Sequence, residues 1–200
     1  MIDEIIKSFT DLTPMLWVSQ IAGLIGLITI GIAYLFDKKR FLLIGTISFV
    51  FFIIEQAFAL LYSNLIVSSV CFIRNILMVI MLYKYNKELS KYLIIALLVL
   101  MWSGVLIYMG ISNTFGVWDN YLPPAIVTMS TITQNSKNEY VVKGGSTLHE
   151  TGFLIYYLVY RLPLSVLRQG ILVIAALIGI GILVYKSVKN KKNIENINIE

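Results

Sequence analysis

The stretch SSVCFIRNILMVI, residues 68–80, decides how this chain folds, because it places an arginine inside an apolar run. The run covers residues 65–83 and is long enough to cross a bilayer as a helix. The guanidinium of Arg74 cannot lose its charge there, so burying it costs several kcal/mol unless another group pairs with it. Glu55, in the preceding apolar run, is the first candidate partner. Opposite charges inside successive spans predict a polar interior surrounded by apolar helices.

The composition places the chain among integral membrane proteins. Hydrophobic residues make up 58% and charged residues 14% of its 200 residues, and the mean hydropathy is +0.82. Soluble domains carry about 25% charged residues. A chain of this length has room for about seven spans of roughly 20 residues and for no soluble domain besides. The acidic start of the chain (Asp3, Glu4) predicts no cleavable signal, and the single Cys71 can form no intrachain disulfide.

The apolar runs predict an all-α protein with seven membrane spans. An amphipathic helix on the membrane surface is expected over residues 1–14, because its apolar residues recur at helical spacing. We expect the spans at residues 15–36, 41–61, 65–83, 92–110, 121–133, 142–160 and 164–185. They divide into a first three-helix unit (15–84), a linker helix (91–111), a second three-helix unit (118–186) and a basic, disordered tail (187–200).

The basic residues predict the orientation in the membrane. One side of a seven-span chain carries nearly all of them: Lys38, Lys39, Arg40, Lys84, Lys87, Lys91, Lys137, Lys143, Lys186, Lys189, Lys191 and Lys192. The opposite side carries only Lys7 and Arg161. Because cytoplasmic loops are rich in Lys and Arg, we expect the N-terminus outside and the C-terminus in the cytoplasm. The net charge of +5 is then a topology signal and does not indicate a nucleic-acid partner.

An internal repeat is predicted at an offset of about one hundred residues. This offset lays the first three spans over the last three and aligns Trp17 with Trp118, Thr46 with Thr147, and Phe52 with Phe153. The fourth span returns the chain to the outside, so both units run in the same direction through the membrane. Parallel three-helix units of this kind are found in SWEET-type transporters, with the polar site near the midplane between them.

Three short motifs carry a resemblance to a known family. They are Trp17-x-x-Gln20, Ile73-Arg74-Asn75 and Tyr121-Leu122-Pro123. With them the chain resembles the YgjV-type bacterial inner-membrane proteins and the wider SWEET, PQ-loop and PnuC-like group. The resemblance implies a 3+1+3 helix bundle in a bacterial inner membrane, in a group whose members move sugars, amino acids or vitamin precursors. The chain departs from the PQ-loop pattern, because Gln20 has no neighbouring proline and Pro123-Pro124 has no glutamine.

The charged residues inside the spans are expected at overlapping depths. At 1.5 Å per residue, Glu55 lies about 21 Å and Arg168 about 22 Å from the cytoplasmic side, Arg74 about 16 Å and Glu150 about 12 Å. Three pairings therefore stay open: Glu55 with Arg74, Glu55 with Arg168, and Glu150 with Arg74. The four charged residues and polar residues of the spans form the candidate substrate-binding or pore-lining set: Gln20, Ser48, Glu55, Arg74, Asn75, His149, Glu150, Tyr156 and Arg168.

Each candidate has a structural alternative. Arg74 either fixes helix register by pairing an acid or contacts a substrate. Glu55 and Glu150 act either as counter-ions or as coupling sites. His149 is either a proton shuttle or a packed histidine bonded to a backbone carbonyl. Pro123-Pro124 is either a gating hinge or an ordinary helix start.

The sequence contains no enzyme signature. It lacks a Gly-rich phosphate loop and an HExxH motif, and its only histidine is His149, so neither a cofactor nor a metal site is expected. We expect a transporter or facilitator for a small polar metabolite such as a sugar, amino acid, nucleoside or vitamin precursor. The alternative is a membrane scaffold or partner-binding subunit whose buried ion pairs only stabilise the fold. The bilayer and the metabolite are the expected partners, and a homo-oligomer stays open.

Overall fold

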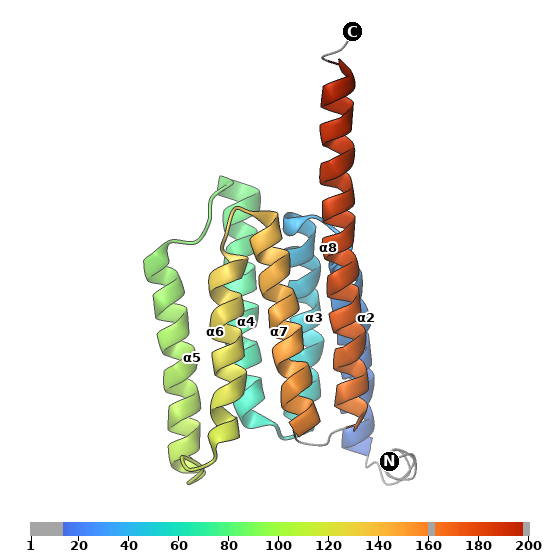
Figure 1. The fold of residues 1–200 in the computed structure, drawn as a ribbon. Helices are drawn as coiled ribbons and strands as arrows, with labels where there is room; N and C mark the ends of the chain where they lie inside the picture. Colours follow the sequence, from blue (N-terminus) through green and yellow to red (C-terminus); the bar gives the residue numbers. More distant parts are fainter. Residues whose placement is uncertain (1–13, 160–162, 198–200) are drawn as a thin grey trace.

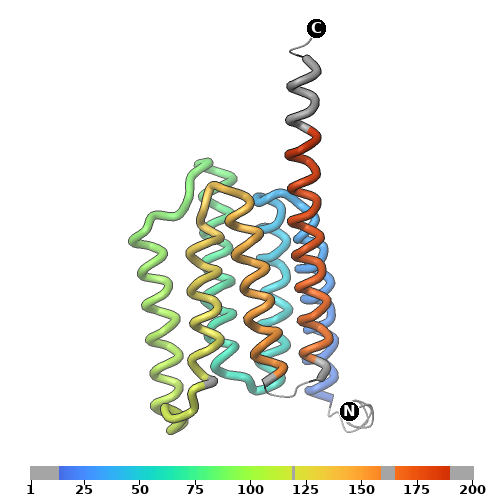
Figure 2. The backbone as a smooth tube through the Cα atoms, in the orientation of Figure 1, coloured from blue at the N-terminus to red at the C-terminus, as the bar shows by residue number. Residues whose placement is uncertain are grey.

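The computed structural model describes residues 14–159 and 163–197 and contains seven α-helices over these ranges (Figures 1 and 2). The helices are α2 (Pro14–Ala33), α3 (Lys38–Phe58), α4 (Tyr62–Ile80), α5 (Lys91–Ile111), α6 (Leu122–Gln134), α7 (Glu139–Val159) and α8 (Pro163–Ile197). A π-helical turn, η1 (Met81–Tyr85), extends α4, and a 3-10 turn, η2 (Trp118–Tyr121), precedes α6. The number of helices agrees with the number of spans that the sequence predicts. The surface helix expected over residues 1–14 lies almost entirely outside the described residues.

Five of these helices are long and apolar enough to cross a membrane, as expected of a multi-pass membrane protein: α2, α3, α4 with η1, α5, and residues 165–189 of α8. Their outer faces carry large exposed apolar side chains, such as Ile107 and Ile111 on α5 and Ile174 and Leu177 on α8. A surface of this extent suits lipid and not water. The two other helices differ for separate reasons. Helix α6 has only 13 residues, and α7 carries Glu139, Lys143 and Glu150.

Two boundaries differ from the sequence prediction. Residues 62–64, expected as a turn, form the start of α4, because the chain already reverses at Leu60, whose φ of 58° is left-handed. At the other end of the chain, α8 continues to Ile197 and projects beyond the bundle (Figure 1). The prediction of a disordered tail from residue 187 therefore does not hold up to residue 197. Residues 184–189 are exposed, and Lys is tolerated in an exposed helix, so α8 continues beyond its apolar part.

The helices pack in two runs, each consecutive in the sequence: α2–α3–α4 and α6–α7–α8. Helix α3 contacts both α2 and α4, and α7 contacts both α6 and α8. The two runs face each other, with contacts between α2 and α8 and between α4 and α6. Figure 1 shows α6, α7 and α8 side by side in front of α4, α3 and α2, with α5 at the edge next to α4 and α6.

Small residues let α2 approach its neighbours closely. Ala22, Gly26 and Ala33 are all buried. A Cβ at position 26 would press on the ring of Phe52 in α3. In lipid the hydrophobic effect does not drive helices together, so the van der Waals contacts of such close packing stabilise the bundle instead.

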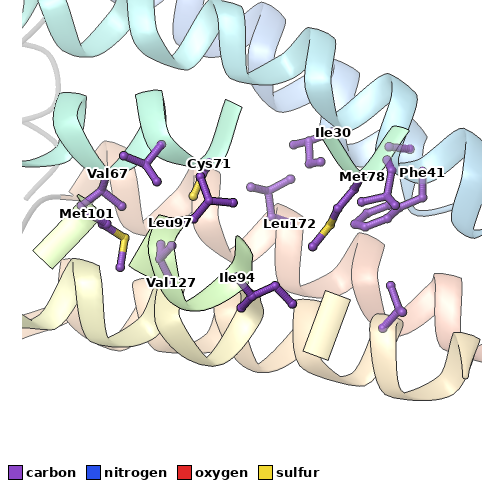
Figure 3. Packing of buried hydrophobic residues seen from close by; sticks show 14 of the residues in the cluster. Ile30, Phe41, Val67, Cys71, Met78, Ile94, Leu97, Met101, Val127 and Leu172 are labelled. Carbon is purple, nitrogen blue, oxygen red and sulfur yellow. The ribbon is translucent and has the colours of Figure 1, made fainter. Parts of the chain in front are cut away.

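The apolar core follows helix α5 along one side. Leu97 and Met101 of α5 pack with Val67 and Cys71 of α4 and with Val127 of α6 (Figure 3). The buried residues of α5 recur at intervals of three or four, the spacing of a single helix face: Ile94, Leu97, Met101, Val105 and Met109. Helix α5 therefore binds the bundle through one apolar stripe.

Lys143 joins three helices from within the protein. Its ammonium group donates hydrogen bonds to the backbone oxygen of Tyr34, directly after α2, over 3.1 Å and to that of Gly179 in α8 over 3.2 Å. Only 3% of the residue is exposed, whereas the sequence places it at the start of a span, among the basic residues that predict the cytoplasmic side. The explanation is that α7 begins at Glu139, three residues before the expected span, so Lys143 lies in its second turn.

Gly179 allows α8 to lie against the end of α2, and replacing it should be costly. A Cβ at this position would collide with the backbone oxygen of Tyr34, which cannot move aside as a side chain can. We predict that Gly179→Ala lowers the free energy of unfolding by about 1–3 kcal/mol. Gly181→Ala, in the same helix with nothing near the new Cβ, should not be destabilising. Thermal unfolding of the purified protein in detergent compares the two; equal melting temperatures would contradict this packing.

Candidate functional site

A cavity of about 200 Å³ lies between the two runs of helices. Side chains from α2, α3, α4, α6, α7 and α8 line it, while α5 contributes none. Eight of the nine residues proposed from the sequence line this cavity: Ser48, Glu55, Arg74, Asn75, His149, Glu150, Tyr156 and Arg168.

Gln20 does not line the cavity, contrary to the sequence prediction. The buried face of α2 instead includes Ser19, Ala22 and Gly23. Ser19, one position before Gln20, points inward and donates a hydrogen bond to the backbone oxygen of Glu55 over 2.9 Å. One residue corresponds to a rotation of about 100° around a helix, which is enough to turn Gln20 away.

Glu55 and Arg168 form an ion pair between α3 and α8. This is one of the three pairings that the sequence left open, and it joins the two residues with nearly equal expected depths. Both side chains are largely buried. Gly23 of α2 leaves room for the pair, because a Cβ there would collide with the carboxyl group and the guanidinium. Three helices therefore meet at this pair.

Arg74 pairs with neither glutamate. Its Nε and Nη2 atoms donate to Asn75 Oδ1 over 3.0 and 2.8 Å, and Nη1 donates to Thr131 Oγ1 of α6 over 2.7 Å. These partners are neutral, and no carboxylate pairs with Arg74 among the described residues. The residue is 2% exposed. The pairings of Arg74 with Glu55 and with Glu150 are therefore wrong, because each carboxylate has other partners.

Glu150 lies in a separate hydrogen-bond network. The Tyr34 hydroxyl donates to its Oε1 over 2.6 Å. Gln169 Nε2 donates to its Oε2 and, over 3.0 Å, to its backbone oxygen. The sequence did not predict Tyr34 or Gln169 as site residues. Tyr34 lies near the end of a span, where a tyrosine usually anchors the membrane interface, but Gln169 follows Arg168 directly in an apolar run and could have been found by that signal.

His149 lies on α7 near Arg74. Both side chains line the cavity. Its ring centroid is 4.9 Å from that of Phe153. The Nδ1 atom is buried and has no hydrogen-bond partner within the described ranges.

Aromatic rings form part of the cavity wall. Phe153 contacts the rings of Tyr156 and Tyr157 in α7, with centroids 6.3 and 6.1 Å apart, and Phe49 packs edge-on against Phe52 in α3. All five line the cavity. The site can therefore hold a molecule with both polar groups and an apolar part.

Helix α6 adds polar groups that the sequence did not single out. Ser130, Thr131 and Gln134 are buried, and Ser130 and Gln134 line the cavity. Pro123 and Pro124 are buried in the first turn of α6, as in an ordinary helix start. No group of three or more His, Cys, Asp or Glu side chains that could hold a metal occurs in the part of the chain that the structure describes.

The ion pair between Glu55 and Arg168 should stabilise the fold as a unit. Removing one partner leaves a buried charge, so Glu55→Gln should cost on the order of 3 kcal/mol, and adding Arg168→Gln should recover much of this loss. Asp37→Asn is the matched control, because Asp37 and Arg40 form an exposed pair at 3.8 Å that should contribute less than about 1 kcal/mol. Thermal unfolding of the wild type, Glu55→Gln, Arg168→Gln and the double variant measures the coupling. Additive losses in the double variant would contradict it.

Comparisons of the chain with protein-family models, with curated proteins and with solved structures find no match. The resemblance to YgjV-type proteins therefore stays a prediction that rests on three short motifs. The function has to be argued from the cavity and its charges.

Proposed function

We propose that this protein is a transporter or facilitator for a small polar metabolite in a bacterial inner membrane. The observation that carries the proposal is the cavity of about 200 Å³, lined by Arg74, Glu55, Arg168, Glu150 and polar neighbours. Charged residues inside a membrane bundle are costly and mark substrate or ion pathways. The cavity and its polar lining suit reversible binding, and we propose no chemical step.

The alternative, a scaffold whose charges only fix the fold, is less well supported. Such a core would pair its charges with one another and exclude space between them. Glu55 and Arg168 do form a pair, but Arg74 and Glu150 each face neutral partners beside the cavity. Burying two more charges without pairing them costs stability, which is easier to understand where they serve a ligand.

A 3+1+3 arrangement provides a mechanism for movement. We propose that α2, α3 and α4 form one unit and α6, α7 and α8 the second, with α5 as the linker. The contacts along α2–α3–α4 and α6–α7–α8 support this division, as does the position of the cavity between the runs. In transporters of this type one unit rocks against the other around a midplane site.

The cavity lining supports an outward-facing state in the proposed orientation. At the end of the bundle near the start of α2, the lining includes Leu61, Asn64 and Ser165. At the other end, the lining includes the rings of Tyr34 and Phe41, which are tilted by 40° with centroids 5.3 Å apart, and the buried Lys143 bonds the backbone oxygen of Tyr34. With the N-terminal side outside, the site is then reached from outside and closed toward the cytoplasm.

Cysteine labelling tests the orientation. With Cys71 replaced by serine, Asn64→Cys and Asn113→Cys should react with a membrane-impermeant thiol reagent added to intact cells. Asn190→Cys should react only after the cells are opened, because the basic residues of its surroundings favour the cytoplasm. Labelling of Asn190→Cys in intact cells would overturn the orientation and, with it, the outward-facing assignment.

Uptake into proteoliposomes tests the function. A thermal-shift screen against sugars, amino acids, nucleosides, carboxylates and vitamins first identifies a ligand, because a ligand stabilises the state it binds. We expect facilitated uptake of that ligand, equal with and without a proton gradient, since Glu55 is held in a permanent ion pair. Uphill accumulation driven by protons would contradict a facilitator, and no ligand and no uptake would favour the scaffold.

Two substitutions on neighbouring residues control this test. Ser48 is fully buried and lines the cavity, so Ser48→Trp should fill the site and stop uptake. Ile47 faces outward and is half exposed, so Ile47→Trp should leave uptake unchanged. Gel filtration checks that both variants are folded. Equal uptake by the two would mean that the cavity is not the transport path.

A further inference from the structure

The guanidinium of Arg74 has hydrogen-bonding capacity left over. An arginine has five N–H donors, and three of those of Arg74 bond Asn75 and Thr131. Two N–H groups remain without a partner among the described residues, on a side chain that is 2% exposed and lines the cavity. A guanidinium with free donors in a water-poor site binds a carboxylate with two parallel hydrogen bonds.

Arg168 is the second cation among the described residues of the cavity lining, and it already has a carboxylate partner. Glu55 pairs with Arg168, and Glu150 accepts from Tyr34 and Gln169. Arg74 is therefore the charge whose neutralisation by an anion would yield the largest electrostatic gain in the site. The chemistry that fits it is a single negative charge.

Two buried acceptors lie in the same corner of the cavity. Gln134 Oε1 and His149 Nδ1 both lack a partner within the described ranges, and both residues line the cavity. Gln134 lies one helical turn after Thr131, which binds Arg74. Its Nε2 atom is 3.5 Å from Ser146 Oγ, one turn before His149. An unpaired buried acceptor is costly, so a fitting ligand brings a hydrogen-bond donor as well as a negative charge.

The ligand's hydrogen-bond donor to Gln134 or His149 should be a neutral group. Arg74, His149 and Gln134 line the same cavity, so an ammonium group bound close to the guanidinium would be repelled, whereas a hydroxyl group would not. The size of the cavity limits the rest of the molecule. An apolar cavity of about 150 Å³ accommodates benzene, so a space of about 200 Å³ suits a molecule slightly larger.

We infer that Arg74 anchors a binding site for small 2-hydroxy monocarboxylates, with the carboxylate on Arg74 and the hydroxyl group on His149 Nδ1 or Gln134 Oε1. The inference rests on the proposed function, because it assigns the substrate class of the same cavity. The apolar part of the ligand then faces the rings of Phe153 and Tyr156, which lie on α7 with His149.

Matched ligands test the charge and the hydroxyl group separately. The melting temperature of the purified protein is measured with lactate, with lactamide, which has nearly the same shape without the charge, with propionate, which lacks the hydroxyl group, and with alanine. Lactate at about 100 times its Kd should raise the melting temperature by roughly 5–10 °C. Lactamide should have no effect, and propionate and alanine should bind at least about tenfold more weakly.

Variants assign the effect to residues. Arg74→Gln should abolish the lactate shift, and Arg74→Lys should not restore it fully, because an ammonium group cannot form the two parallel bonds. Arg40→Gln, at an exposed arginine, is the control and should keep the shift. If Arg74→Gln does not fold, His149→Phe with Gln134→Leu decides, because this variant should bind lactate and propionate equally.

Several results would overturn the site: no shift with lactate, an equal shift with lactamide or with chloride alone, tighter binding of alanine, or an unchanged lactate shift in Arg74→Gln. Binding in detergent needs no transport, so the two proposals can fail separately. Charge-selective lactate binding without uptake would leave the site standing and remove the transporter. Uptake of a neutral metabolite by wild type and Arg74→Gln alike would support the transporter and contradict the carboxylate site.

Discussion

The structure depends on one constraint: a charge inside a membrane bundle has no water to solvate it. Each buried charged group is accordingly surrounded by donors or acceptors from other helices. Arg74 of α4 reaches α6 through Thr131, and Lys143 of α7 reaches the end of α2 and α8. These bonds have a direction, whereas apolar contacts between helices in lipid have almost none. The polar interior therefore fixes how the helices are rotated, and the apolar faces follow.

Glycine positions make this interior possible. Glu55 and Arg168 meet only because residue 23 has no side chain, and Lys143 reaches two carbonyl groups only because residue 179 lets α8 approach Tyr34. The buried polar contacts therefore depend on small residues at these positions.

The sequence predicted the number of helices and eight of the residues that line the cavity, because apolar runs and helical spacing are local signals. Depth along a span was also informative: Glu55 and Arg168 were expected at nearly the same level and do pair. Rotation around the helix axis was less predictable. Gln20 and Ser19 differ by one position, and only Ser19 points inward. The partners of Glu150 come from residues 116 and 19 positions away, and no single-sequence pattern reveals such contacts.

Tyr34 holds the two runs of helices together in two ways at once. Its hydroxyl group binds Glu150 of α7, and its backbone oxygen accepts from Lys143 on the same helix. Separating the end of α2 from α7 would have to break both bonds, and neither gives way first while the other keeps the residue in place. The contact is therefore cooperative: both bonds break together, and the two helices do not separate gradually. A bundle closed by such a cooperative contact would change between discrete states, so any separation of α2 from α7 at this end would be infrequent and complete.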